Sequence, residues 1–167
     1  MAEIFNYNPD EVSILLAGIM TADGLVDGTF ITVSKDIAPY RSRTTSDGRV
    51  VRLYQNSSTY TISLTLHIGS SANTFLTKLW QLDEITQVGK FPIFIKDHTG
   101  SDLFFAATSW IEGLPTLTKS NSVDTRTWTI KCTSAVINYG SNNGASGVLE
   151  DLLNIATGAL PGIGGLL

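Results

Sequence analysis

The chain has 167 residues, of which 43% are apolar and 16% are charged. This length and apolar content suit one folded domain with a hydrophobic core, and they exclude a wholly disordered chain. Eleven Lys and Arg residues against 15 Asp and Glu residues give a net charge of −4. That sign disfavours a protein that binds a nucleic-acid backbone by releasing counterions.

Cysteine content and hydropathy indicate the redox compartment of the protein and whether it is exported or spans a membrane. The single cysteine, Cys132, excludes an internal disulfide and a cysteine-rich zinc module. Residues 1–10 lack the basic and then apolar run of a signal peptide, and no stretch reaches the roughly 18 consecutive apolar residues of a membrane span. We therefore expect a soluble protein of a reducing compartment, without a membrane partner.

The first strand candidates in the chain are residues 13–20 and 28–35. The dipeptides Asp23-Gly24 and Asp27-Gly28 lie between them and are typical of turns. The run from Asp23 to Gly28 faintly resembles a calcium loop, but it lacks the closing glutamate, so turn chemistry is the better interpretation.

Residues 38–56 contain four of the five arginines around a central Ser46-Asp47-Gly48 turn, which predicts a long protruding hairpin or loop. The segment has a net charge of +3, whereas the remainder of the chain has −7. It could contact a phosphate backbone, another copy of the same protein, or solvent alone; we favour another copy. The expected contacts between subunits or rings are Arg41, Arg43, Arg49, Arg52 and Tyr54.

Residues 59–68 alternate strictly between polar and apolar side chains, which predicts a half-buried strand. The next segment, 71–88, has apolar residues spaced by three and four, from Phe75 to Ile85, and predicts the one helix, which must bury that stripe against a sheet or the end of a barrel. Further strands are expected at 90–96, 103–111 and 125–132, the last with Trp128, Ile130 and Cys132 on its buried face.

The end of the chain departs from this pattern. A Ser-, Asn- and Gly-rich stretch from Ser141 predicts a flexible linker into the apolar segment 148–160. We therefore divide the chain into a β domain over residues 1–140 and an apolar extension over 141–167. Because exposed apolar helices are rarely left uncovered, we expect this extension to dock on a neighbouring subunit rather than on its own domain. The expected docking residues are Leu149, Leu152, Leu153 and Ile155.

Residues able to carry chemistry are few. His67 lies on a polar strand face and His98 in a turn, without metal-ligand spacing, and Cys132 shares an apolar face. No phosphate-binding glycine motif is present. The sequence therefore predicts no enzyme, no cofactor and no metal site.

Several stretches together resemble the tail tube proteins of contractile-tailed bacteriophages. They are the run Asp27-Gly28-Thr29-Phe30-Ile31-Thr32-Val33, the long hairpin, the strand Tyr60–Leu66, the helical run Leu79-Trp80-Gln81-Leu82-Asp83-Glu84 and the strand Thr125–Cys132. The resemblance covers roughly residues 10–138, and the extension from Ser141 departs from it.

The resemblance implies a mainly antiparallel β-sandwich or half-barrel with one helix and a long hairpin. It implies a virion protein, assembled in the host cytoplasm, whose hexameric rings stack into the inner tail tube, with sheath, baseplate and terminator proteins as partners. DNA would pass through the ring on its way to the host without specific binding. The polar strand faces would then supply the channel lining, with Thr61, Ser63, Thr65, His67, Thr127, Thr129 and Lys131 as candidates.

The residues leave two alternatives open. The same fold serves tail terminators, baseplate hubs and the tubes of contractile injection systems. A carbohydrate-binding β-sandwich would instead need exposed aromatic residues on one sheet, for which Trp110 and Tyr139 are the candidates.

Overall fold

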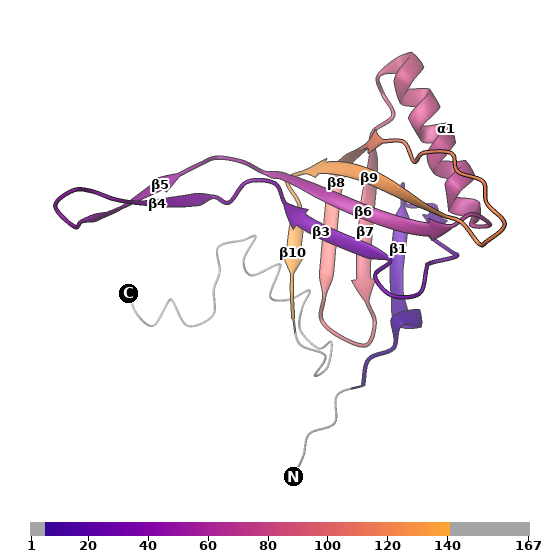
Figure 1. Ribbon diagram of the computed structural model, residues 1–167, viewed down its shortest axis with the longest axis horizontal. Coiled ribbons are helices and arrows are strands. Elements are labelled where there is room, and N and C mark those ends of the chain that lie inside the picture. The colour runs from indigo at the N-terminus through magenta and orange to yellow at the C-terminus, as the bar shows by residue number, and fades with distance from the viewer. Residues whose placement is uncertain (1–5, 141–167) are drawn as a thin grey trace, which may run out of the picture.

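The computed structural model describes residues 6–140, which form a curved antiparallel sheet, a protruding hairpin and one α-helix (Figure 1). The first element within the described residues is the 3-10 turn η1 (Pro9–Glu11). The elements that follow are β1 (Val12–Leu16), β2 (Met20–Thr21), β3 (Ile31–Lys35), β4 (Tyr40–Thr44), β5 (Val50–Tyr54), β6 (Thr59–His67), α1 (Ser71–Thr86), β7 (Phe91–Asp97), β8 (Leu103–Gly113), β9 (Thr125–Thr133) and β10 (Val136–Asn138).

The large sheet has the order β2-β1-β7-β8-β9-β6-β3, and β10 also pairs with β8. Strand β8 joins the two halves of the sheet, because its first residues pair with β7 and β10 and its last residues pair with β9. The register shifts once where β8 pairs with β7 and once where β8 pairs with β9, which marks a β-bulge or irregularity in each pairing. Strands β2 and β3 end the order without pairing with each other, so the sheet does not close into a barrel within the described residues. The mainly antiparallel fold with one helix and a protruding hairpin is confirmed.

The expected strand 13–20 is divided in two. Ala17 and Gly18 both have positive φ values, of 55° and 72°, and the amide of Ile19 donates to the carbonyl of Leu16. This tight turn folds β2 back onto β1. The short strand β10 was not predicted from the sequence, because three residues are too few to show a period of two.

The core lies on one side of the sheet. The fully buried side chains of β6 and β9 are Ile62, Leu64, Leu66, Trp128, Ile130 and Cys132, as the alternation in the sequence predicts. Ile14, Leu16, Ile93 and Phe104 extend the same core across β1, β7 and β8, and Ala72 and Leu76 contribute from α1.

The part of α1 from Ala72 to Trp80 supplies its contacts with this core. Ala72, Asn73 and Leu76 are buried, and Phe75, Leu79 and Trp80 pack beside them. The expected apolar stripe continues to Leu82 and Ile85, but these side chains are 47% and 83% exposed. Figure 1 shows why: the second half of the helix extends past the end of the sheet.

Candidate assembly surfaces

The hairpin β4–β5 is exposed along both of its strands. Every residue of both strands is exposed, including Val50, Val51 and Leu53. Figure 1 shows the hairpin reaching away from the body of the domain. A two-stranded hairpin alone in water is marginally stable at best, and the apolar side chains of this hairpin are not covered by the described domain.

A compact turn forms the tip of the hairpin. Gly48 has a φ of 82°, its amide donates to the carbonyl of Thr45, and the amide of Thr45 donates to the carbonyl of Arg49. The hydroxyl of Thr45 also donates to Asp47, whose carboxylate forms an ion pair with Arg49 at 3.1 Å. Arg49 therefore has an acidic neighbour within its own turn.

The pairing of β4 with β5 distributes the other arginines over two faces. Arg41 lies opposite Leu53, and Arg43 lies opposite Val51, so one face is both basic and apolar. Arg52 lies on the other face, where its guanidinium stacks 3.4 Å from the ring centroid of Tyr40, beside Tyr54. The structure therefore does not gather the predicted contact residues into one cluster, and Arg41 and Arg43 have no acidic partner among residues 6–140.

Hydroxyl side chains cover the face of the β3-β6-β9 region that lies opposite the core. Thr61, Ser63, Thr65 and His67 of β6 lie directly opposite Lys131, Thr129, Thr127 and Thr125 of β9. The hydroxyls of Thr65 and Thr127 are 3.0 Å apart. The seven residues predicted to line a channel thus share one surface, which we call the threonine face.

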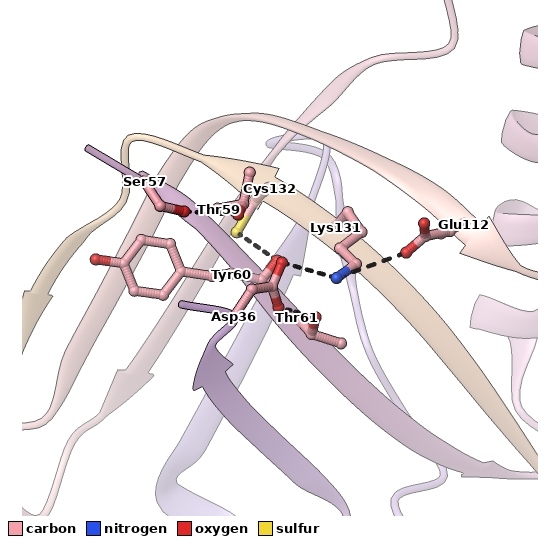
Figure 2. A network of polar contacts seen from close by, with 8 residues as sticks. All are labelled: Asp36, Ser57, Thr59, Tyr60, Thr61, Glu112, Lys131 and Cys132. Carbon is pink, nitrogen blue, oxygen red and sulfur yellow. Dashed lines mark hydrogen bonds and ion pairs between the residues drawn. The ribbon is translucent and has the colours of Figure 1, made fainter. Parts of the chain in front are cut away.

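The charged groups of the threonine face neutralise one another (Figure 2). The Lys131 ammonium lies 2.7 Å from the carboxylate of Asp36 and 3.8 Å from that of Glu112, and the Thr61 hydroxyl donates to Asp36. The hydrogen bond from Lys131 lowers the pKa of Asp36, and the same bond raises the pKa of Lys131. This face therefore presents hydroxyls and a compensated cation rather than a free positive charge.

Carboxylates line two adjoining hollows at the start of β3. One hollow, of about 640 Å³, is lined by Asp10, Asp23 and Asp27, and the other, of about 360 Å³, by Asp97 and Asp102. The residues lining either hollow include no Lys or Arg among those that the structure describes. Figure 1 shows that the hairpin follows the other end of β3. The arginines of the hairpin and the carboxylate-lined hollows therefore belong to opposite ends of this strand.

The Asp23-Gly24 turn joins one of these hollows to α1. The carboxylate of Asp23 accepts hydrogen bonds from Ser70 and Ser71 at the start of the helix, and the Ser70 bond is the main reason that its pKa is lowered. Gly24 has a φ of 61°, and a Cβ there would lie 3.0 Å from that of Ser70. Ser70 is the N-cap residue of α1, and its hydroxyl oxygen accepts a hydrogen bond from the Ala72 amide. The Asp23-Gly24 segment therefore supports the cap of this helix.

Among the described residues, the side chains that could bind a metal ion or act as a nucleophile do not form a site. No cluster of three His, Cys, Asp or Glu residues suited to a metal ion occurs among residues 6–140. Cys132 is buried, and burial raises the pKa of its thiol to about 11, which makes a thiolate nucleophile unfavourable. Among the same residues, no helix has the length and apolar character needed to cross a bilayer.

A comparison with known protein families finds no matching family. The chain is 27% identical over 154 residues to structural protein ORF10 of Pseudomonas phage KPP10, a match that covers 88% of this chain and 89% of that protein. This chain is therefore similar, over most of its length, to a phage structural protein.

Solved structures with the same fold come from contractile injection systems. The sheath/tube terminator of the extracellular system PVC superposes with a TM-score of 0.57 at 14% identity, covering 83% of this chain and all of the other. The tube-terminating cap of the anti-feeding prophage gives a TM-score of 0.53 at 15% identity and covers 83% of this chain and 94% of that one. A chain of the PVC sheath-tube complex gives 0.51 at 16% identity and covers 80% and 91%. The fold is thus shared with tube and terminator structures.

The predicted docking residues of the extension, from Leu149 to Ile155, lie outside the described residues. The aromatic candidates for carbohydrate binding are not on one surface: Trp110 is half-buried opposite Lys131, whereas Tyr139 is exposed beyond β10 and lines an acidic hollow. The hollows, which take residues from η1, β1 and the segment before β3, were not predicted, because their lining comes from distant parts of the chain.

Proposed function

We propose that this protein is a ring-forming structural subunit of a contractile phage tail, and that it acts at the end of the tail tube as a terminator. The hairpin carries the proposal, because an arm whose apolar and basic side chains are all exposed requires a partner surface. The similarity to a phage structural protein and the fold shared with terminators support the same function.

The distribution of charge supports association between identical copies. The basic face of the hairpin and the carboxylate-lined hollows lie at opposite ends of β3, so the hairpin of one copy and the hollows of another have complementary charges. A contact between two different surfaces of the same protein is heterologous, and such contacts close into a ring when the rotation between copies allows it. Six copies per ring is the number that the resemblance to tail tube proteins implies.

The threonine face is the surface we assign to the channel. Hydroxyl groups offer DNA weak hydrogen bonds, and the compensated Lys131 offers no free counterion for a phosphate. Such a wall would let DNA move through the ring without being held. This assignment places Thr61, Ser63, Thr65, His67, Thr127, Thr129 and Lys131 on the inner side of the ring.

A repeating tube subunit is the second candidate. The fold of the PVC sheath-tube chain favours it, although its TM-score is lower than those of the two terminating proteins. The two functions differ in what the purified protein builds. A tube subunit has two complementary ring faces and grows into an open filament, whereas a terminator stops at one ring.

Electron microscopy of the purified full-length chain, together with its mass in solution over a range of concentrations, separates these outcomes. Discrete rings that form as the concentration rises and do not lengthen into tubes are expected. Long tubes would favour the tube subunit over the terminator. A protein that stays monomeric at high concentration, even when preformed tube ends from the same tail are added, would contradict both functions.

A set of matched variants tests the hairpin. Replacing all four hairpin arginines by Ser should abolish rings while leaving the thermal unfolding of the monomer unchanged. The control replaces Lys78, Lys90 and Lys119, exposed cations elsewhere on the domain, by Ser. If the hairpin variant assembles like the control, the hairpin is not the assembly arm.

Charge exchange then tests the partner surface. Arg41→Glu with Arg43→Glu should prevent assembly, and adding Asp10→Lys with Asp27→Lys should restore it. No hydrogen bond or ion pair within residues 6–140 involves the carboxylates of Asp10 and Asp27, so we expect their replacement to leave the fold intact. Failure of the fourfold variant to recover would move the hairpin contact to another surface.

A further inference from the structure

A row of apolar side chains crosses the outer face of the other half of the sheet. Leu15 of β1 lies opposite Phe94 of β7, Phe94 lies opposite Phe105 of β8, and Phe105 lies opposite Val136 of β10. We call these four residues the outer apolar row. They come from four neighbouring strands that Figure 1 shows side by side, and at about 4.8 Å between strands the row is about 14 Å long.

This row is separate from the hydrophobic core. The alternate residues Ile14, Ile93 and Phe104 face the core, and α1 adds Leu76 to that same side, so the helix leaves the outer side uncovered. Phe105 is 37% exposed and Val136 is 43% exposed. A hollow of about 240 Å³ opens at the row, lined by Leu15, Gly18, Pro92, Phe94 and Phe105.

We propose that the row is the docking site of the chain's own segment 148–160, folded back onto the same copy. The described chain leaves the domain next to this surface, because Val136 of the row precedes Gly140 by four residues. The exit is fixed in place: the Asn138 amide donates to the Ser101 carbonyl at 3.0 Å, and the Gly140 amide donates to Asp102 at 2.9 Å.

The length of the remaining chain suits this path. Val136 and Gly140 are at most about 14 Å apart, and the seven residues 141–147 can span up to about 25 Å. Thirteen residues in helical form are about 20 Å long, enough to cover the row. Within the segment, Leu149, Leu152, Leu153 and Ala156 recur at spacings of three, four and seven, which places them on one helical face.

The charges of segment 148–160 and of the surface around the outer apolar row also favour docking of the segment there. The segment's only ionisable side chains are those of Glu150 and Asp151, and residues 141–167 include no Lys or Arg. Lys96 lies two residues from Phe94 on the same side of β7, and it makes no ion pair within residues 6–140. The acidic and apolar segment 148–160 is therefore complementary to the outer apolar row and to the Lys96 cation beside it. This proposal differs from the sequence-based expectation that the extension docks on a neighbouring subunit.

Hydrogen exchange of the full-length chain, at a concentration where its mass in solution is that of a monomer, tests the proposal. The amides of 148–160 should exchange more slowly than those of the linker 141–147. Phe105→Asp should remove this protection, while Leu53→Asp, a matched control at an exposed leucine of the hairpin, should leave it unchanged. Protection of the β6 and β9 amides reports whether each variant is folded.

Lys96→Glu provides a second variant that leaves the apolar row intact, and it should also weaken the protection of 148–160. Equal exchange of 148–160 and the linker in the unaltered chain would overturn the proposal, and so would protection that survives both Phe105→Asp and Lys96→Glu. Protection that appears only as the concentration rises would place the segment on another copy and would also overturn it. None of these readouts depends on ring formation, so they stand apart from the tests of the proposed function.

Disulfide trapping identifies which copy is contacted. In a Cys132→Ser background, Val136→Cys is combined in turn with Leu149→Cys, Leu152→Cys and Leu153→Cys and oxidised at the same low concentration. A bond within one chain is expected for at least one pair, and none is expected when Thr129→Cys on the threonine face replaces Val136→Cys. Bonds only between chains, or equal trapping at position 129, would contradict docking on the row.

Discussion

The indole Nε1 of Trp128 donates a 2.9 Å hydrogen bond to Oδ1 of Asn73, and both side chains are almost fully buried. The amide nitrogen of Asn73 in turn donates to the carbonyl of His67 at 2.8 Å. One polar side chain in α1 thus binds the helix to β9 and to the end of β6. This joint fixes the helix on the core side of the sheet.

Asn73→Ala leaves the Trp128 N–H buried without an acceptor, so we expect a loss of about 1–3 kcal/mol in the free energy of unfolding. Trp128→Phe removes the donor together with some packing. Because the two residues share one bond, the double variant should lose less than the sum of the single losses. Urea unfolding of the four proteins measures this, and strict additivity would show that the bond contributes little.

Asp23→Asn keeps an oxygen for Ser70 but removes the negative charge at the start of α1. We expect a loss of less than about 1 kcal/mol near neutral pH, since the carboxylate is largely exposed. The folded-state pKa of Asp23 lies below its ordinary value of 3.8. Its stabilisation is therefore complete above that value and is lost as the pH falls through the folded-state pKa.

Thermal unfolding of wild type and Asp23→Asn as a function of pH tests this. The difference between the two proteins should be constant at neutral pH and should shrink below about pH 3.8. A difference that stays the same at low pH would mean that the hydrogen bonds, rather than the charge, matter. Asp27→Asn, outside the helix start, is the control.

Lys131→Met removes the ammonium that binds Asp36 and Glu112 on the threonine face. The pKa of Asp36 should then rise, because its lowering results first from the hydrogen bond with Lys131. Nuclear magnetic resonance titration of the Asp36 carboxyl group follows this directly. An unchanged pKa would mean that Thr61 and Thr59 alone hold the carboxylate in its charged form.

The two halves of α1 should respond differently to truncation of their leucine and isoleucine side chains. Leu76→Ala removes a fully buried side chain and should cost about 2–5 kcal/mol. Ile85→Ala, at a side chain that is 83% exposed, should change the free energy of unfolding by no more than about 0.5 kcal/mol. Denaturant unfolding compares them, and a large cost at Ile85 would show that the end of the helix is covered in solution.

The sequence by itself determined the local features, because each depends on neighbouring residues. The period of two at residues 59–68 and 125–132 predicted which side chains of β6 and β9 face the core. The Ser46-Asp47-Gly48 turn predicted the hairpin, and spacings of three and four predicted the helix. The resemblance to a phage structural family also rests on such short runs.

Only the tertiary structure decided how these elements meet. Whether the apolar stripe of α1 is covered depends on where the sheet ends, and Leu82 and Ile85 in the last part of the helix are exposed. Lys131 binds Asp36, which lies 95 positions away in the sequence. The residues of the outer apolar row come from strands that are not consecutive in the chain. These relationships depend on the order of strands in the sheet, which contacts between distant residues establish and which no local pattern contains.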